Sequence, residues 1–265
     1  MIKFNDKKPL AIGCVHVLPL PGAAGYSGDL YGIIHKAVEE AVIYSETGFD
    51  AIILENMHDT PYLRGYVYPE TVAAMTAVAC TVRQCLPDMT LGIQILSAAN
   101  REALAVSIAA KLNFVRVEGY TFAHVADEGI IQSCAADLIR ARDYLKANDV
   151  AIFSDIKKKH SAHSITADVS IEETAETAEF MRADGVIITG SATGKSPDLN
   201  ELKAVKKVTK LPVMLGSGIT PDNIASYKAY TDAVIIGSYC KIDGFWKNTV
   251  SVDRCKTFID ALNNA

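Results

Sequence analysis

Polar or charged residues follow most of the short apolar runs of this chain, and several could carry acid–base chemistry. These residues are His16, Glu55, Asn56, Gln94, Glu118, Asp155, Thr189, Ser217 and Ser238. A buried strand has little reason to end in a charge unless that charge is paired or faces a site. Carboxylates and imidazoles exchange protons with reacting groups. We therefore predict catalytic roles for Glu55, Asp155 and His16, and substrate contacts for Asn56, Gln94, Glu118 and Thr189.

The alternative for each of these residues is a rim position, paired with a Lys or Arg side chain and not involved in chemistry. This alternative applies first to Glu118, because Arg116 lies only two positions before it.

Two glycine turns near the C-terminus have the pattern of a phosphate cradle. Gly216-Ser217-Gly218 follows the apolar run Leu211–Leu215, and Gly237-Ser238 follows Ala233–Ile236. Glycines let the backbone approach a ligand closely. Thr220 and Pro221 are suited to the start of a helix, where free N–H groups attract anions. We predict a phosphate site at Gly216, Ser217, Gly218, Gly237 and Ser238; the alternative is two tight turns without a ligand.

A basic run, Lys157-Lys158-Lys159-His160, follows the acidic strand end at Asp155. Such a run is usually a solvated surface. Here we predict that Lys159 faces the site and contacts Asp155, Glu118 or a bound anion. We predict that His160, which can shuttle protons near neutral pH, assists catalysis.

Two further patterns are weaker. Gly190–Ser196 resembles a P-loop but has three residues between its glycines where four are required, so we expect a polar loop that touches substrate through Thr193.

Cys14-x-His16 lies on one face of a strand, and His58, Asp59 or His160 could add metal ligands. Metal barrels often begin with His-x-His, and the cysteine weakens the match. We predict no metal and no cofactor.

Eight apolar runs alternate with helical patterns, with no linker between them. The strands expected are Leu10–Val17, Ala51–Leu54, Thr90–Leu96, Phe114–Val117, Val150–Phe153, Gly185–Ile188, Leu211–Leu215 and Ala233–Ile236. Strict alternation predicts a parallel sheet, and eight units predict closure into a single (β/α)8 TIM barrel over residues 1–265. An open Rossmann-like sheet is less consistent, because its G-x-G motif should follow the first strand.

The composition excludes several classes of protein. With 49% hydrophobic and 22% charged residues over 265 positions, the chain has the composition of a globular protein. A net charge of −5 argues against broad nucleic-acid binding, and we predict no nucleic-acid partner. Six scattered cysteines favour a reducing compartment, and we predict a cytoplasmic location. The apolar run Leu10–Leu18 is interrupted by His16 and bounded by prolines, and no run is long enough to span a bilayer.

Several motifs together resemble the BtpA family over nearly the whole chain. They are Gly13–Gly22, Glu55–Pro61, Asp155–His160, Thr189–Gly194, Gly216–Thr220 with Asn223, and Ile236–Lys241. The resemblance implies a phosphate-binding TIM barrel. One branch of the family is linked to photosystem I biogenesis in cyanobacteria; another, SgcQ-like, is described as a nucleosidase. The chain departs from the family pattern at Gln94–Asn100 and at Arg116-Val117-Glu118, both at the mouth of the expected barrel.

These observations predict an enzyme that acts on a phosphorylated sugar or nucleoside-type molecule, with cleavage of a glycosidic bond as one possible reaction. A phosphorylated ligand and further copies of the same chain are the expected partners. The alternative is a non-catalytic assembly or regulatory factor on the same barrel. Carboxylates gathered in one pocket favour the enzyme, because an assembly factor does not need them.

Overall fold

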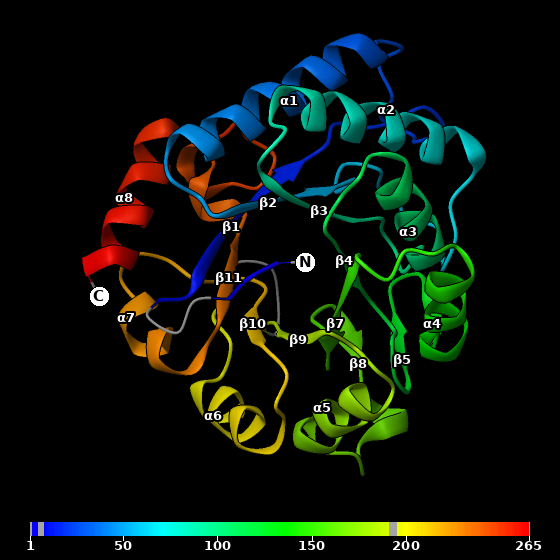
Figure 1. The fold of residues 1–265 in the computed structure, drawn as a ribbon, viewed down its shortest axis with the longest axis vertical. Helices are drawn as coiled ribbons and strands as arrows, with labels where there is room; N and C mark the ends of the chain where they lie inside the picture. Colours follow the sequence, from blue (N-terminus) through cyan, green and yellow to red (C-terminus); the bar gives the residue numbers. More distant parts are fainter. Residues whose placement is uncertain (1, 5–7, 191–194, 265) are drawn as a thin grey trace.

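Eight parallel strands close into a barrel in a computed structural model that describes residues 2–4, 8–190 and 195–264. The strands follow one another around the ring in chain order (Figure 1). They are β1 (Leu10–His16), β2 (Ala51–Glu55), β3 (Thr90–Gln94), β4 (Phe114–Val117), β7 (Ala151–Ile156), β9 (Gly185–Ile188), β10 (Val213–Leu215) and β11 (Ala233–Ile236). The last strand pairs with the first, with Leu10 beside Ala233. The predicted (β/α)8 fold is confirmed.

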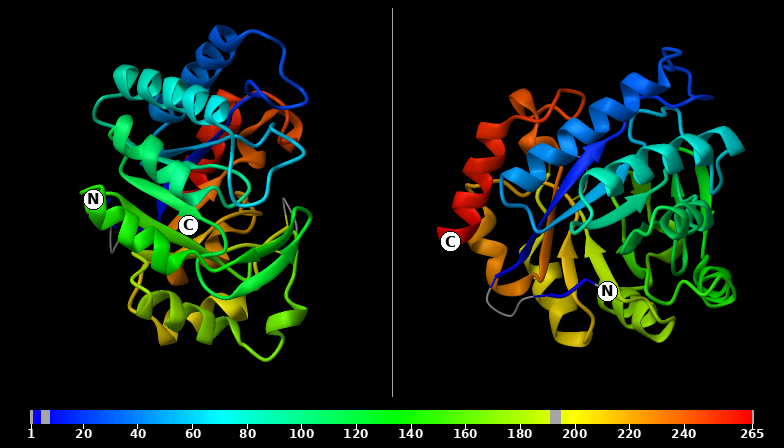
Figure 2. Two further views of the ribbon diagram at one scale, coloured as in Figure 1. Left: turned by 90° about the vertical axis from the view of Figure 1, so that its right-hand side faces the viewer. Right: turned by 45° about the horizontal axis from the view of Figure 1, so that its top comes forward.

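Helices surround the strands, as Figures 1 and 2 show from different directions. They are α1 (Leu30–Glu46), α2 (Pro69–Cys85), α3 (Asn100–Ala109), α4 (Ala135–Tyr144), α5 (Ile171–Phe180), α6 (Leu199–Val208), α7 (Ile224–Tyr227) and α8 (Val252–Asn264). Local sequence fixes several helix starts. Ser170 and Glu173 form the reciprocal hydrogen bonds of a capping box at α5. Asp29 accepts a hydrogen bond from the Gly32 N–H at the start of α1.

Alternation along each strand produces two apolar layers. Side chains such as Ile12, Ile53, Phe153 and Met214 fill the inside of the barrel. The intervening residues pack outward against the helices. The same alternation continues to the carboxyl ends of the strands, where the inward positions change from apolar to polar. This change in residue type places the candidate site at the mouth of the barrel.

A small antiparallel sheet beside the barrel was not predicted. It consists of β5 (Ala123–Ala126), β6 (Gly129–Gln132) and β8 (Ser161–Ala162), in the order β6-β5-β8. The hairpin β5–β6 follows β4, and β8 follows β7. This sheet therefore links the loops that carry Glu118 and Lys157–His160. Its strands are only two to four residues long, too short for a clear alternating pattern.

The helix after β10 begins later than predicted. Thr220 does not cap it: the Thr220 N–H donates to Asn223 Oδ1 at 2.9 Å, and α7 begins at Ile224 and spans four residues. The Asn223 side chain forms this tight turn and so delays the helix.

Among the residues with described positions, no helix has the length and apolar character needed to cross a membrane.

Candidate active site

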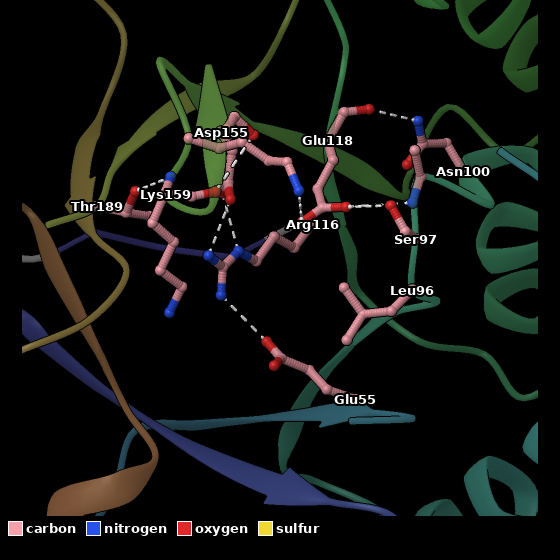
Figure 3. Close-up of polar contacts among 12 residues, drawn as sticks. Glu55, Leu96, Ser97, Asn100, Arg116, Glu118, Asp155, Lys159 and Thr189 are labelled. Atoms are coloured by element: carbon pink, nitrogen blue, oxygen red, sulfur yellow. Dashed lines mark hydrogen bonds and ion pairs between the residues drawn. The ribbon is translucent and has the colours of Figure 1, made fainter. Parts of the chain in front are cut away.

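Three charged side chains from three strands form a buried cluster at the barrel mouth (Figure 3). Arg116 of β4 binds both oxygens of Asp155 on β7, through Nε and Nη2, each at 2.9 Å. Its Nη1 donates to Glu55 Oε1 on β2 at 3.1 Å. The structure thus brings Glu55 and Asp155 together through one guanidinium. Their negative charges raise the pKa of Arg116 and outweigh the opposing effect of burial.

Glu118 belongs to a neighbouring network. It pairs with Lys158, with Nζ and Oε1 3.2 Å apart. Its other oxygen accepts hydrogen bonds from Ser97 Oγ and the Ala98 N–H, at 3.3 and 3.2 Å. Glu118 is therefore paired with a basic side chain, as the alternative for this residue expected, but its partner is Lys158 and not the nearby Arg116. Residues 116 and 118 both point inward, but the guanidinium extends toward Asp155 and Glu55 instead (Figure 3).

A pocket of about 230 Å³ opens beside the charged cluster. Both glycine turns line it, so all five residues of the predicted phosphate site face one space: Gly216, Ser217, Gly218, Gly237 and Ser238. The predicted catalytic residues His16, Glu55 and Lys159 line the same pocket, as do Cys14, Arg116 and Arg254. The pocket therefore combines backbone turns suited to an anion with cationic and acid–base side chains.

Gly218 is required by the backbone itself. Its φ is +73°, and a Cβ there would lie 2.1 Å from the Lys195 carbonyl oxygen. The turn at Gly218 thus packs directly on the loop that follows β9. The Ser217 hydroxyl also binds this loop, because it accepts a hydrogen bond from the Gly190 N–H at 3.3 Å. The turn is therefore held in place by its neighbour.

The three lysines after β7 point in different directions. Lys157 donates to the Thr166 carbonyl at 2.9 Å, and Lys158 pairs with Glu118. Lys159 lines the pocket, and its backbone N–H donates to Thr189 Oγ1 at 2.9 Å (Figure 3). Burial, followed by the nearby Arg116 charge, lowers the pKa of the Lys159 ammonium. The ion pair with Glu118 thus belongs to Lys158, and Lys159 keeps its amine in the pocket.

His16 is held by the segment before α8. Its Nδ1 lies 2.9 Å from the Trp246 carbonyl oxygen, which can only accept a hydrogen bond, so Nδ1 carries the proton. Burial, and then the charge of Lys241, lowers the pKa of His16 to about 3. The imidazole is therefore neutral at physiological pH, with Nε2 as a free base.

Other predicted residues lie away from this pocket. Asn56 is buried and binds Asp59 and the backbone of Leu96, so it supports a loop. Gln94 is buried but does not line the pocket. Thr189 lines an adjoining cavity together with Lys157–Lys159. His160 is exposed, and burial of part of its ring lowers its pKa. Thr193 lies outside the described residues.

The described residues contain one group of three potential metal ligands, Cys14, His16 and Glu55. Their ligand atoms all lie within 4.8 Å of one another. Burial and the adjacent Glu55 carboxylate raise the pKa of the Cys14 thiol. The other ligands considered from sequence lie elsewhere. His58 packs against Trp246, and Asp59 accepts hydrogen bonds from Leu20 and Asn56.

Sequence reasoning missed Arg116, Lys158 and Arg254. Arg116 had a visible signal, because it is a charge inside the otherwise apolar strand Phe114–Val117. A charge there needs buried partners of opposite sign. Arg254 had none, because it lies on the amphipathic helix α8, where an arginine is ordinarily solvated. Only the packing of α8 beside the second glycine turn brings it to the pocket.

Comparisons with known proteins agree with this architecture. A model described as the BtpA family matches residues 6–264. An uncharacterized mitochondrial protein of Caenorhabditis elegans is 46% identical, over 98% of this chain and 95% of that protein. The photosystem I biogenesis protein BtpA of Synechocystis is 35% identical, over 98% and 89% of the two chains.

Solved structures share the fold at low sequence identity. In (S)-3-O-geranylgeranylglyceryl phosphate synthase from Thermoplasma acidophilum, the match has a TM-score of 0.61 and 12% identity, and covers 97% of this chain and 94% of the synthase. That likeness shows a shared barrel. The family model and the Synechocystis relative extend over nearly the whole sequence, and the chain therefore belongs to the BtpA family.

Proposed function

We propose that this protein is an enzyme that acts on a phosphorylated small molecule, a sugar phosphate or a nucleoside derivative. The observation that carries the proposal is the pocket that joins both glycine turns to Glu55 and Arg116. Asp155 does not line this pocket and is connected to it through the guanidinium of Arg116. The Gly216 N–H already donates to the Ile188 carbonyl at 2.8 Å, so the first turn can offer an anion only the backbone N–H groups that follow it. The cluster offers carboxylates to a reacting carbon or proton. A ligand with a phosphate at one end and a reactive bond at the other fits this arrangement.

The phosphate end is supported by two cations on the pocket wall. Arg254 stacks on Tyr239, with its guanidinium carbon 4.4 Å from the ring centre. Lys159 enters from the loop after β7 and, among the described side chains, forms no ion pair. Both can neutralise a phosphate. The synthase with the same fold was solved in complex with its substrate sn-glycerol-1-phosphate, which supports a phosphorylated ligand here.

The reactive end favours cleavage of a glycosidic bond. Asp155 is fixed by two hydrogen bonds from Arg116, so its charge can stabilise an oxocarbenium-like carbon. Glu55 lies across the same guanidinium and can take a proton from the attacking water. Lys159, with its lowered pKa, can donate a proton to the leaving group. His160 lies outside the pocket and would assist only through the loop that it shares with Lys159.

A second function has one observation in its favour. The Synechocystis relative is called a photosystem I biogenesis protein, which is an assembly role. The two functions differ in one measurable respect. An assembly factor needs the outer surface of the barrel and makes no use of the charged pocket.

Phosphate binding tests the proposal directly. Calorimetry with inorganic phosphate and a panel of sugar and nucleoside phosphates should show binding to the natural protein. Arg254→Gln should weaken it roughly tenfold or more, since a hydrogen bond to a charged group contributes about 1.5–3 kcal/mol. Lys256→Gln removes one positive charge from an exposed position of the same helix and should have little effect. Equal affinities for the two variants would contradict the phosphate site.

Turnover tests the reactive end. For any panel member that the protein converts, Asp155→Asn should reduce kcat by at least about a hundredfold, the lower range for loss of one preorganised group that stabilises charge in the transition state. Circular dichroism would verify that the variant is folded. Full activity of a folded Asp155→Asn protein would remove Asp155 from the mechanism.

The remaining expectations are proposals of the same kind. We propose that the protein does not bind nucleic acid, that it forms homo-oligomers, and that it lies in the cytoplasm. All six cysteines are free, as expected in a reducing compartment.

A further inference from the structure

The register of the first two strands places three different ligand types side by side. Cys14 and His16 are two residues apart on β1, so both point into the barrel. Glu55 is the register partner of His16 on β2 and therefore has the same inward direction. All three side chains are buried, and their ligand atoms lie within 4.8 Å of one another.

Each of the three can offer a lone pair. The His16 Nδ1–H donates to the Trp246 carbonyl, which leaves Nε2 as the ligand atom and fixes the ring. Glu55 uses Oε1 for Arg116, and its second oxygen remains. A Cβ at residue 237 would lie 2.8 Å from His16 Nε2, so glycine keeps the space in front of this nitrogen open.

We propose that Cys14, His16 and Glu55 bind a divalent transition-metal ion of the zinc class at the wall of the phosphate pocket. Mixed sulfur, nitrogen and oxygen ligands suit zinc. Tetrahedral ligands at roughly 2.0–2.3 Å from the ion lie about 3.3–3.8 Å apart, so the side chains need to close by only about 1 Å. Three protein ligands leave the fourth position for water or a substrate oxygen, as in catalytic zinc sites.

The charges around Cys14, His16 and Glu55 permit a metal ion to bind there. Binding releases the thiol proton to solvent, so the site gains one net positive charge. Two of the nearby cations are already paired, Arg116 with Glu55 and Asp155, and Lys241 with Glu40; a third, Lys159, lines the same pocket. The added charge would face a pocket proposed to hold an anion. The inference goes beyond the proposed reaction: with the ion bound, Glu55 would be a ligand, and the ion would activate water in place of the base role proposed for Glu55. Metal binding is measured without substrate.

Cobalt titration tests the site in the full-length protein. After dialysis against a chelator and under reducing conditions, Co²⁺ should give one equivalent of a thiolate-to-metal absorption band, which Zn²⁺ should displace. Cys14→Ser should abolish the band. His16→Gln and Glu55→Gln should weaken metal affinity by 10- to 100-fold or more, at least the effect of losing a supporting residue. Cys85→Ser alters an exposed cysteine and should leave the band unchanged.

Gly237→Ala provides a variant that keeps all three ligands. Its methyl group would occupy the space before His16 Nε2, and we expect it to weaken Co²⁺ binding while the thermal unfolding temperature shows that the protein is folded. An unchanged band in folded Cys14→Ser, or no band in the natural protein, would overturn the metal site. Neither result would affect phosphate binding, so the two proposals can fail separately.

Discussion

Arg116 organises the site at the scale of single residues. One guanidinium, which is 5% exposed, makes three hydrogen bonds to two carboxylates from different strands. Arginine is suited to this because its planar fork matches a carboxylate while the remaining N–H groups bind a second partner. The cluster carries two negative charges and one positive charge. Its stability therefore depends on the guanidinium more than on either acid.

Arg116→Met should leave both carboxylates buried without their partner. We expect the free energy of unfolding at pH 7 to fall by about 3–5 kcal/mol, the usual cost of breaking a buried ion pair. Arg116→Lys should recover part of the loss, since an ammonium cannot bind both oxygens of Asp155 in a fork. Urea denaturation would measure both. Arg140→Met, on the exposed surface of α4, is the control; equal stability for the two Met variants would contradict the central role of Arg116.

The strand ends illustrate how far the sequence could predict this site. Glu55 and Asp155 were predicted to share a pocket because parallel strands in a barrel end at one mouth. Both bind Arg116, but only Glu55 lines the pocket of the glycine turns. Asn56 lies one position later, and the alternation of side chains turns it away from the pocket. That difference depends on where the strand ends, and the structure extends β2 to Glu55.

At the scale of elements, the antiparallel sheet holds the loops around the mouth. β5 pairs with both β6 and β8, with Val125 beside Ile130 and beside Ala162. The sheet contains His124, which packs on His163 with ring centres 5.6 Å apart. The buried Nε2 of His124 has no hydrogen-bonding partner within the described part of the chain. This sheet had no clear sequence signal because its strands are two to four residues long, and because its third strand, β8, pairs with β5 from a distant part of the chain.

His124 should make the protein sensitive to acid. Burial, followed by the charges of Lys158 and His163, lowers its pKa to about 4, with an opposing effect from Asp155. The unfolded chain has the ordinary value near 6.5. As pH falls from about 6.5 to 4, the unfolded state takes up a proton that the folded state does not, and stability falls by up to about 1.4 kcal/mol per pH unit.

His124→Gln should remove this contribution, so its unfolding free energy should decline less steeply between pH 6.5 and 4.5 than that of the natural protein. Urea denaturation at several pH values would give the two slopes. His35→Gln alters an exposed histidine on α1 and should keep the natural slope. If His124→Gln keeps it as well, the imidazole is not held neutral by burial.

At the scale of the whole molecule, the barrel closes where its last unit meets its first. β1 pairs with β11 on one side and with β2 on the other. Behind this seam, Lys241 and Glu40 form an ion pair with Nζ and Oε2 2.6 Å apart, 1% and 5% exposed. The other oxygen of Glu40 accepts the Val250 N–H at 3.2 Å. One carboxylate on α1 thus binds two positions in the segment between β11 and α8.

Breaking this pair should show how much the seam contributes. Glu40→Gln leaves the Lys241 ammonium buried without its charged partner, and Lys241→Met leaves the Glu40 carboxylate buried without its partner. Each substitution should lower the free energy of unfolding by about 3–5 kcal/mol. The double variant Glu40→Gln/Lys241→Met contains neither charge and keeps an acceptor for Val250. It should therefore be more stable than the sum of the single losses implies.

Glu39→Gln, which breaks the exposed pair with Lys36 on the same helix, should cost less than about 1 kcal/mol. Additive losses in the double-variant cycle would mean that the two residues stabilise the barrel independently, and that the seam is closed by strand pairing and apolar packing alone.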